Sequence, residues 1–292
     1  MRLRGWMCAA TLLAAATAHG FDWARLHSEA ERVTFQSMSE TEKSLDQQDD
    51  AVYVCALRLL AVHQDEAAER YFKAILARSP DSVGAAWGVG EVARRRHDLD
   101  RSRDLLEKVV KREPAFWPAV VSLSRVVFLK QDFHRSLELA EKVTDAGEKA
   151  SDSATFALGL VMVGEAKAML AHTGGVVAKV RYGAGVQANL ERAAKLRPDM
   201  PDVMLNLGAF YVFAPGIAGG DFDKGVGMLG KAIEKDPLLT DAYVRLGQAH
   251  RMKGEEQEYQ SLMEQARTID PKSELVVDVL SGKCVFICVD KK

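Results

Sequence analysis

Helix-like stretches of apolar and polar residues recur along the chain, and several of them run up to a proline. Proline lacks the amide proton that a helix interior needs and restricts the residue before it, so each of these prolines marks a helix end. Pro80 and Pro114 lie 34 residues apart, and so do Pro237 and Pro271. The helices predicted before them are Ala67–Arg78, Arg101–Arg112, Asp223–Lys235 and Glu255–Ile269.

A glycine that follows a leucine or valine lies upstream of several prolines. Gly90 and Gly247 each precede theirs by 24 residues, whereas Gly208 and Gly159 precede theirs by 29 and 39. A glycine lets two helices approach closely, because it has no side chain at the contact. The longer intervals predict insertions at residues 213–222 and 171–185. Long loops are often functional, although a mere spacer is the alternative for residues 171–185.

This arrangement resembles the tetratricopeptide repeat, a 34-residue helical hairpin. The unit 240–273 carries the pattern most fully, and weaker units follow in phase at 49–82, 83–116, 117–150, 152–198 and 201–237. The resemblance implies an all-α solenoid of about six hairpins, since each hairpin buries its apolar face only against its neighbours. The matching residues of the best unit are Tyr243, Leu246, Gly247, Gly254, Ala266 and Pro271.

The ends of such a solenoid need caps. The amphipathic stretch Phe21–Phe35 is predicted to cap the start, so that residues 21–48 form an N-terminal capping helix and a linker. The repeats then occupy residues 49–273, and residues 274–292 form the C-terminal cap and tail, with Gly282 ending the helix.

Residues 1–20 are typical of a cleaved signal peptide. Arg2 and Arg4 precede an apolar run, Met7–Ala16, and small residues follow it. We therefore expect a periplasmic or secreted protein whose mature N-terminus is His19 or Phe21. No other segment is predicted to span a bilayer.

The charge balance argues against a nucleic-acid partner, because 39 basic and 41 acidic residues give a formal net charge of −2. After cleavage three cysteines remain, Cys55, Cys284 and Cys288, which is not a disulfide framework. Cys284 and Cys288 are either a disulfide or two buried apolar thiols.

No catalytic, cofactor or metal site is expected. Gly225–Ala232 is similar to a phosphate-binding loop, but Ala232 stands where that loop needs a hydroxyl, and the stretch lies inside a predicted helix. None of the seven histidines forms a metal-binding pair. The sequence therefore predicts a protein that is not an enzyme.

The concave face of a tetratricopeptide solenoid is lined by the first helix of each hairpin, and the resemblance places aromatic and charged residues there. Arginines bind carboxylates, so an acidic or C-terminal peptide of a protein partner is the expected ligand. The alternative for Trp87 and Phe128 is packing on neighbouring helices. The predicted groove residues are Tyr53, Trp87, Glu91, Arg95, Arg125, Phe128, Phe156 and Arg251.

The expected function is that of an exported adaptor or assembly factor that binds a protein or peptide without catalysis. A second resemblance gives the alternative. Phe210–Asp221 and the following Lys224 look like the T-component of tripartite ATP-independent periplasmic (TRAP) transporters. Those helical repeat proteins pair with a solute-binding protein, and a central pore is a proposed path for their ligand. A transport role predicts a pore, whereas an adaptor predicts an open groove.

Overall fold

The computed structural model describes residues 21–32 and 49–287, and no strand occurs among them. The predicted signal peptide, most of the linker and Cys288 therefore lie outside the described residues. The predicted all-α solenoid of helical hairpins is confirmed. Its pairs are α3 (Asp49–Ala61) with α4 (Asp65–Arg78), α5 (Val83–Arg95) with α6 (Leu99–Arg112), α7 (Trp117–Leu129) with α8 (Phe133–Ala146), α9 (Ser153–Thr173) with α11 (Val186–Leu196), α12 (Pro201–Phe213) with α13 (Phe222–Lys235), and α14 (Thr240–Met252) with α15 (Glu256–Ile269).

Further elements flank or interrupt the hairpins. A capping helix lies at each end of the described chain, and a short helix separates α9 from α11. Two 3-10 turns connect other helices. These elements are α1 (Trp23–Arg32), η2 (Glu148–Ala150), α10 (Val176–Gly183), η3 (Gly216–Ala218) and α16 (Glu274–Ser281).

The first three hairpins turn at a residue in the left-handed region. His63, His97 and Gln131 follow one another at intervals of 34 and have φ values of 59°, 62° and 67°. Gly254 takes the same role in the last hairpin, with φ 79°. Because this conformation ends one helix and redirects the chain, it holds the two histidines at the tips of their hairpins.

Glycines allow a close helix contact between α12 and α13. A Cβ atom added to Gly225 would lie 2.7 Å from the carbonyl oxygen of Gly208 and 2.8 Å from the backbone nitrogen of Val212. Real Cβ atoms do not approach backbone this closely, so only glycine permits the observed packing. The repeat spacing identified Gly208, whereas Gly225 stood in the stretch that is similar to a phosphate-binding loop; its role is helix packing.

Helix α9 corrects the expectation that no segment beyond the signal peptide could span a bilayer. Within the described residues it is long and apolar enough to do so, although 72% of its apolar window is buried. It packs against α7, α8, α10, α11 and α12, which accounts for its apolar composition as that of a core helix. The sequence hid this feature because Glu165 and Lys167 interrupt the run.

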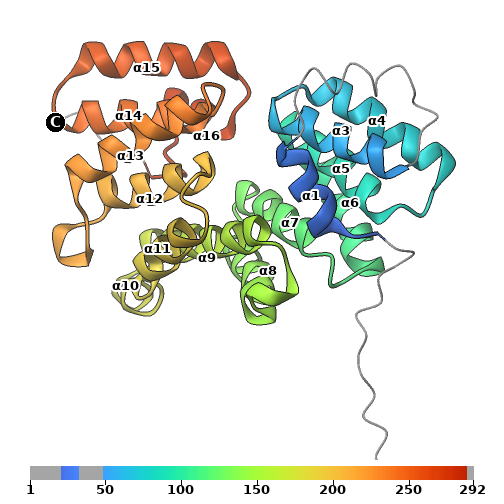
Figure 1. The fold of residues 1–292 in the computed structure, drawn as a ribbon. Helices are drawn as coiled ribbons and strands as arrows, with labels where there is room; N and C mark the ends of the chain where they lie inside the picture. The colour runs from blue at the N-terminus through green and yellow to red at the C-terminus, as the bar shows by residue number, and fades with distance from the viewer. Residues whose placement is uncertain (1–20, 33–48, 288–292) are drawn as a thin grey trace, which may run out of the picture.

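The hairpins form a strongly curved arc, with α3–α8 on one arm, α12–α16 on the other and α9 between them (Figure 1). The last repeats contact the first two across the opening. His63, at the α3–α4 turn, meets Asp236 at the end of α13, and His97, one repeat later, meets Asp270 at the end of α15. These contacts join the two arms across the concave face.

The C-terminal segment adds a further bridge between the arms. Phe286 stacks on Phe128 of α7 with ring centroids 5.7 Å apart. The carboxylate of Asp278 in α16 accepts hydrogen bonds from the backbone N–H groups of Val285 and Phe286, which fixes the segment's path. Cys284 is disulfide-bonded, so the alternative of two free thiols is wrong; its partner cysteine lies outside the described residues.

Helix α1 caps the first hairpin and also reaches across the arc. Trp23 packs edge to face on Trp87 and Phe116, and its indole Nε1 donates to Asp152 at the start of α9, over 2.5 Å. Glu31, in the last turn of α1, pairs with Arg197 after α11 at 2.8 Å. The helix therefore forms part of the wall around the concave face.

Candidate functional site

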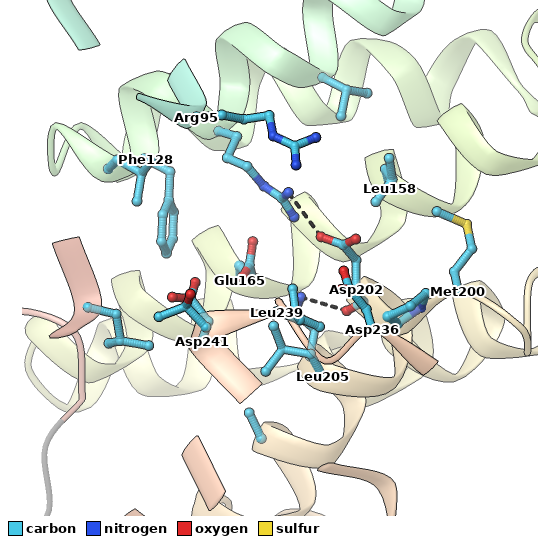
Figure 2. A pocket seen from close by; sticks show the side chains of 18 of the residues that line it. Arg95, Phe128, Leu158, Glu165, Met200, Asp202, Leu205, Asp236, Leu239 and Asp241 are labelled. Atoms are coloured by element: carbon cyan, nitrogen blue, oxygen red, sulfur yellow. Dashed lines mark hydrogen bonds and ion pairs between the residues drawn. The ribbon is translucent and has the colours of Figure 1, made fainter. Parts of the chain in front are cut away.

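The arc encloses a cavity of about 2050 Å³. Its wall is built mainly by the first helices of the hairpins, together with α1, the C-terminal segment and the turns that close the arc. Charged and apolar side chains line it together, and Figure 2 shows several of them pointing toward one another from the two arms.

His63 connects the two arms through a chain of polar contacts. Its Nε2 lies 2.9 Å from a carboxylate oxygen of Asp236, and Nη2 of Arg95 lies 2.7 Å from its Nδ1. A guanidinium only donates, so Nδ1 accepts and Nε2 carries the proton that is donated to Asp236. Arg95 also pairs with Asp65 at 3.0 Å. His63 thus has a hydrogen-bond partner on each side of its ring.

His97 occupies the equivalent position one repeat later but faces two acids. Its Nε2 lies 2.7 Å from Asp270 and its Nδ1 lies 2.9 Å from Glu274. Burial disfavours the charged ring, but hydrogen bonds to Asp270 and Glu274 outweigh it and raise the pKa of His97 to about 9. His97 is therefore an imidazolium at neutral pH and binds both acids of the opposite arm.

Arg125 of α7 forms a third link between the arms, at the centre of the cavity. Its guanidinium pairs with Asp202 at the start of α12 over 3.0 Å (Figure 2). Burial opposes the charge on the guanidinium, but Asp202, Glu165 and Glu91 raise the pKa of Arg125 above its usual value. Arg125 stays charged and paired.

Two acids in the cavity wall form no ion pair with the described residues. Burial, with Asp241 and Asp202 nearby, raises the pKa of Glu165 to about 7, although Arg125 and Arg245 act against it. Burial also raises the pKa of Asp241, which accepts a hydrogen bond from Ser273 at 3.2 Å. Figure 2 shows these two acids beside each other.

Two arginines in the wall likewise form no ion pair with the described residues. The Nε of Arg58 is buried without a hydrogen-bond partner there. Arg245 donates to Gln248 and to the backbone carbonyl of Ile287. The cavity therefore offers unpaired groups of both signs, next to an apolar lining that includes Leu158, Met200, Leu205 and Leu239 (Figure 2).

The structure brings five of the predicted groove residues to the cavity wall. Trp87 is mostly buried, donates to Ser122 at 2.9 Å and packs on other aromatic rings. It therefore lines the groove and also packs on neighbouring helices, which were the two alternatives predicted for it. Phe128 also lines the wall and is stacked on Phe286. The remaining three are Glu91, paired with Arg94, and the arginines Arg95 and Arg125.

Three predicted groove residues lie elsewhere. Tyr53 is buried in the aromatic cluster under Phe21 and Trp23 of the N-terminal segment, and Phe156 is fully buried in the core. Arg251 lies over the ring of Tyr259 and donates to its hydroxyl, outside the cavity lining. The placement in the groove is therefore wrong for these three.

Sequence reasoning missed the residues that close the arc, although a signal was present. His63 and His97 are 34 residues apart, and so are Asp236 and Asp270, each directly before a repeat proline. The same period thus relates both partners of both contacts. Within the described residues, no group of three or more His, Cys, Asp or Glu side chains has an arrangement that holds a metal ion.

Comparisons with known proteins agree with this fold. Residues 56–120 match the tetratricopeptide repeat family. A chain of the APC/C hetero-tetramer Cut9–Hcn1 is similar in structure, with a TM-score of 0.59 and 12% identity over 87% of this chain and 46% of that one. Human IFIT1, in a dimer with PPP-AAAA, gives a TM-score of 0.54 and 15% identity over 75% of this chain and 50% of its own.

The chain thus spans about half the length of these two structures. YrrB, described as a TPR protein with an unusual peptide-binding site, aligns over 73% of this chain and 97% of its own, at 15% identity and a TM-score of 0.36. No curated protein matches the chain in sequence. Taken together, the in-phase helical hairpins, the tetratricopeptide-repeat match over residues 56–120 and the structural neighbours give this chain the fold of a tetratricopeptide-type helical solenoid.

Proposed function

We propose that the protein is a non-enzymatic binding protein that holds a peptide segment of a partner protein in its central cavity. The observation that carries this proposal is the cavity itself, whose volume of about 2050 Å³ exceeds the range of about 300–1,000 Å³ that is usual for small-molecule sites. A cavity of this volume has room for an extended peptide, and repeat solenoids supply long preformed surfaces for peptides.

The charges inside the cavity argue for a ligand with both signs of charge rather than an acidic one. The expectation of an acidic peptide rested on Arg95 and Arg125, but both are already paired with acids of this chain. Four groups of the cavity form no ion pair with the described residues: the basic residues Arg58 and Arg245, and the acidic residues Glu165 and Asp241. A peptide that carries acidic and basic side chains satisfies both sets.

Site-specific photo-crosslinking tests this function. A photoreactive amino acid at Leu158, which faces the cavity, is expected to capture a partner peptide in the native host, to be identified by mass spectrometry. The control places the same photoreactive amino acid at Lys108, which is exposed on α6, the second helix of its hairpin. The proposal fails if Leu158 captures nothing, or if both positions capture the same proteins.

An exported location is the second part of the proposal. It rests on the sequence of residues 1–20 and on the disulfide at Cys284, because structural disulfides persist in oxidising compartments and are rare in the cytosol. N-terminal sequencing of the native protein is expected to begin at His19 or Phe21. A native protein that begins at Met1 in a cytosolic fraction contradicts it.

A role like that of the T-component of TRAP transporters is the second candidate, and the closure of the arc favours it. Contacts such as His97 with Asp270 join the arms across the concave face, whereas an adaptor was expected to have an open groove. Native mass spectrometry separates the candidates. A bound solute of a few hundred daltons together with a co-purifying solute-binding protein supports this role, and a bound peptide supports the first.

A further inference from the structure

The two insertions that break the 34-residue period lie side by side in the structure. One forms α10 between α9 and α11, and the other forms η3 between α12 and α13; both lie at one edge of the arc (Figure 1). Gly219 of the second insertion packs so closely on Gln187, just after the first, that an added Cβ would lie 2.0 Å from the amide oxygen. Two separate departures from the repeat therefore build one local structure.

This structure exposes an unusual amount of apolar surface. Among the described residues, Ile217 and three valines of α10 are the most exposed large apolar side chains: Ile217 is fully exposed, and the valines are 74–80% exposed. Exposed apolar side chains that gather in one place mark interaction sites more often than scattered ones do. We call these four residues the insertion surface, together with two exposed basic residues of α10; its members are Val176, Val177, Val180, Ile217, Lys179 and Arg181.

The insertion surface rests on an ordered polar base. Nζ of Lys224 donates to the hydroxyl of Tyr211 at 2.6 Å, and that hydroxyl donates to Glu191 at 2.8 Å. Gln187 donates to the same carboxylate at 2.9 Å. This network joins α11, α12 and α13, the helices that border the two insertions. The insertions thus emerge from helices that are hydrogen-bonded to one another.

The charged residues of α10 have one sign. Residues 166–190 contain no Asp or Glu, whereas Lys179 and Arg181 project from the same helix as the valines. Two acids on neighbouring helices already have partners: Glu141 of α8 pairs with Lys167 at 3.4 Å, and Glu191 accepts hydrogen bonds from Gln187 and Tyr211. The exposed acids Asp221 and Asp223 follow η3. Helix α10 therefore presents aliphatic groups and positive charge together.

We propose that the insertion surface docks the protein on an anionic lipid membrane. Aliphatic side chains that project from a convex edge bury themselves in the boundary between headgroups and acyl chains without any matching shape, and adjacent basic residues bind the anionic headgroups. The surface offers no groove and no exposed aromatic residue of the kind that anchors a protein partner. Lys179 also borders the cavity, whereas the four apolar residues of the surface do not line it.

Vesicle flotation tests the proposal on the full chain. Wild-type protein is expected to float with phosphatidylcholine vesicles that contain phosphatidylglycerol, and to bind pure phosphatidylcholine vesicles more weakly. The variant V176S/V177S/V180S/I217S should lower affinity for the anionic vesicles by more than about tenfold, because binding scales with buried apolar area. The charge variant K179E/R181E should remove the preference for anionic lipid. All proteins carry the same N-terminus, so differences among them report on this surface alone.

A matched control removes exposed apolar groups from the other end of the chain. V277S/L280S changes two exposed residues of α16 and should bind vesicles as the wild type does. Equal vesicle binding by the wild type and the fourfold serine variant overturns the proposal, and so does a wild type that does not float with anionic vesicles. Sedimentation velocity tests the alternative that a second copy of the chain binds this surface. A wild-type dimer that the serine substitutions dissociate would assign the surface to that contact instead.

Discussion

His97, at the turn between α5 and α6, donates from Nε2 to Asp270, 173 residues later, over 2.7 Å. His63 and Asp236 repeat this relationship one unit earlier, again across 173 residues. The first two repeats are therefore joined to the last two by residues at equivalent positions. The concave face of the solenoid is closed by the repeat pattern itself.

The first prediction concerns the pH dependence of stability. The folded-state pKa of His97 is about 9, above the unfolded value of about 6.5. Protonation thus favours the folded state, so this contribution is fully present below pH ~6.5 and is lost as the pH rises through ~9. The melting temperature should fall between pH 7 and 10 more steeply in the wild type than in His97→Asn, since asparagine tolerates the left-handed turn. If circular dichroism gives the same change of melting temperature with pH for the wild type and the variant, the raised pKa of His97 is contradicted.

A second prediction concerns the shape of the molecule. Replacing both histidines, His63→Asn with His97→Asn, removes the contacts with Asp236, Asp270 and Glu274 but leaves each hairpin intact. We expect a larger radius of gyration in small-angle X-ray scattering, with unchanged helical circular dichroism. The control is His134→Asn on the second helix α8, which contacts none of these acids. An unchanged radius in the double variant shows that other contacts suffice for closure.

A third prediction compares two glycines on one helix. Gly225→Ala places a Cβ 2.7 Å from the carbonyl oxygen of Gly208 and should destabilise the fold by about 1–3 kcal/mol through overpacking. Gly227→Ala, with nothing within 4 Å of its Cβ, should instead stabilise α13 by about 0.5–1 kcal/mol. Chemical denaturation measures both. Equal effects would mean that α12 and α13 do not pack as described.

The fourth prediction concerns Glu165. Its folded-state pKa of about 7 lies above the unfolded value of about 4.3, so its effect favours folding fully below pH ~4.3 and disappears as the pH rises through ~7. Above that pH the protein carries a buried carboxylate that it does not pair. Glu165→Gln should therefore raise the melting temperature at pH 8 and change it little at pH 5. A loss of stability at pH 8 would show that Arg125 or Arg245 depends on this charge.

The fold was predictable because its signals are local. A proline such as Pro114 ends a helix by its own chemistry, and a glycine such as Gly208 lies where two helices touch, so their spacing gives the phase of the repeats. The site was less predictable. Tyr53 has the position of a groove residue, but the N-terminal segment covers it with Phe21 and Trp23, and no repeat pattern describes that segment.

Closure of the arc depends on a property that no single repeat carries. Small rotations between successive hairpins add up along the chain, and only their sum decides whether Asp270 reaches His97. The lengthened fourth and fifth units contribute to that sum, and their geometry is not written in the spacing of Gly159 or Gly208. The sequence shows the matching intervals between the two histidines and the two aspartates. Without the curvature of the solenoid, these intervals do not predict that the residues meet.

The contacts between His63 and Asp236 and between His97 and Asp270 also bear on how the protein comes apart. A linear array of repeats frays from its ends, because a terminal unit has a neighbour on one side only. Here the first unit is braced by the fifth and the last unit by the second, so neither is a free end. Amide hydrogens of α4 and α15 should then exchange through one shared opening event, and the array should lose its structure as a single cooperative body rather than unit by unit.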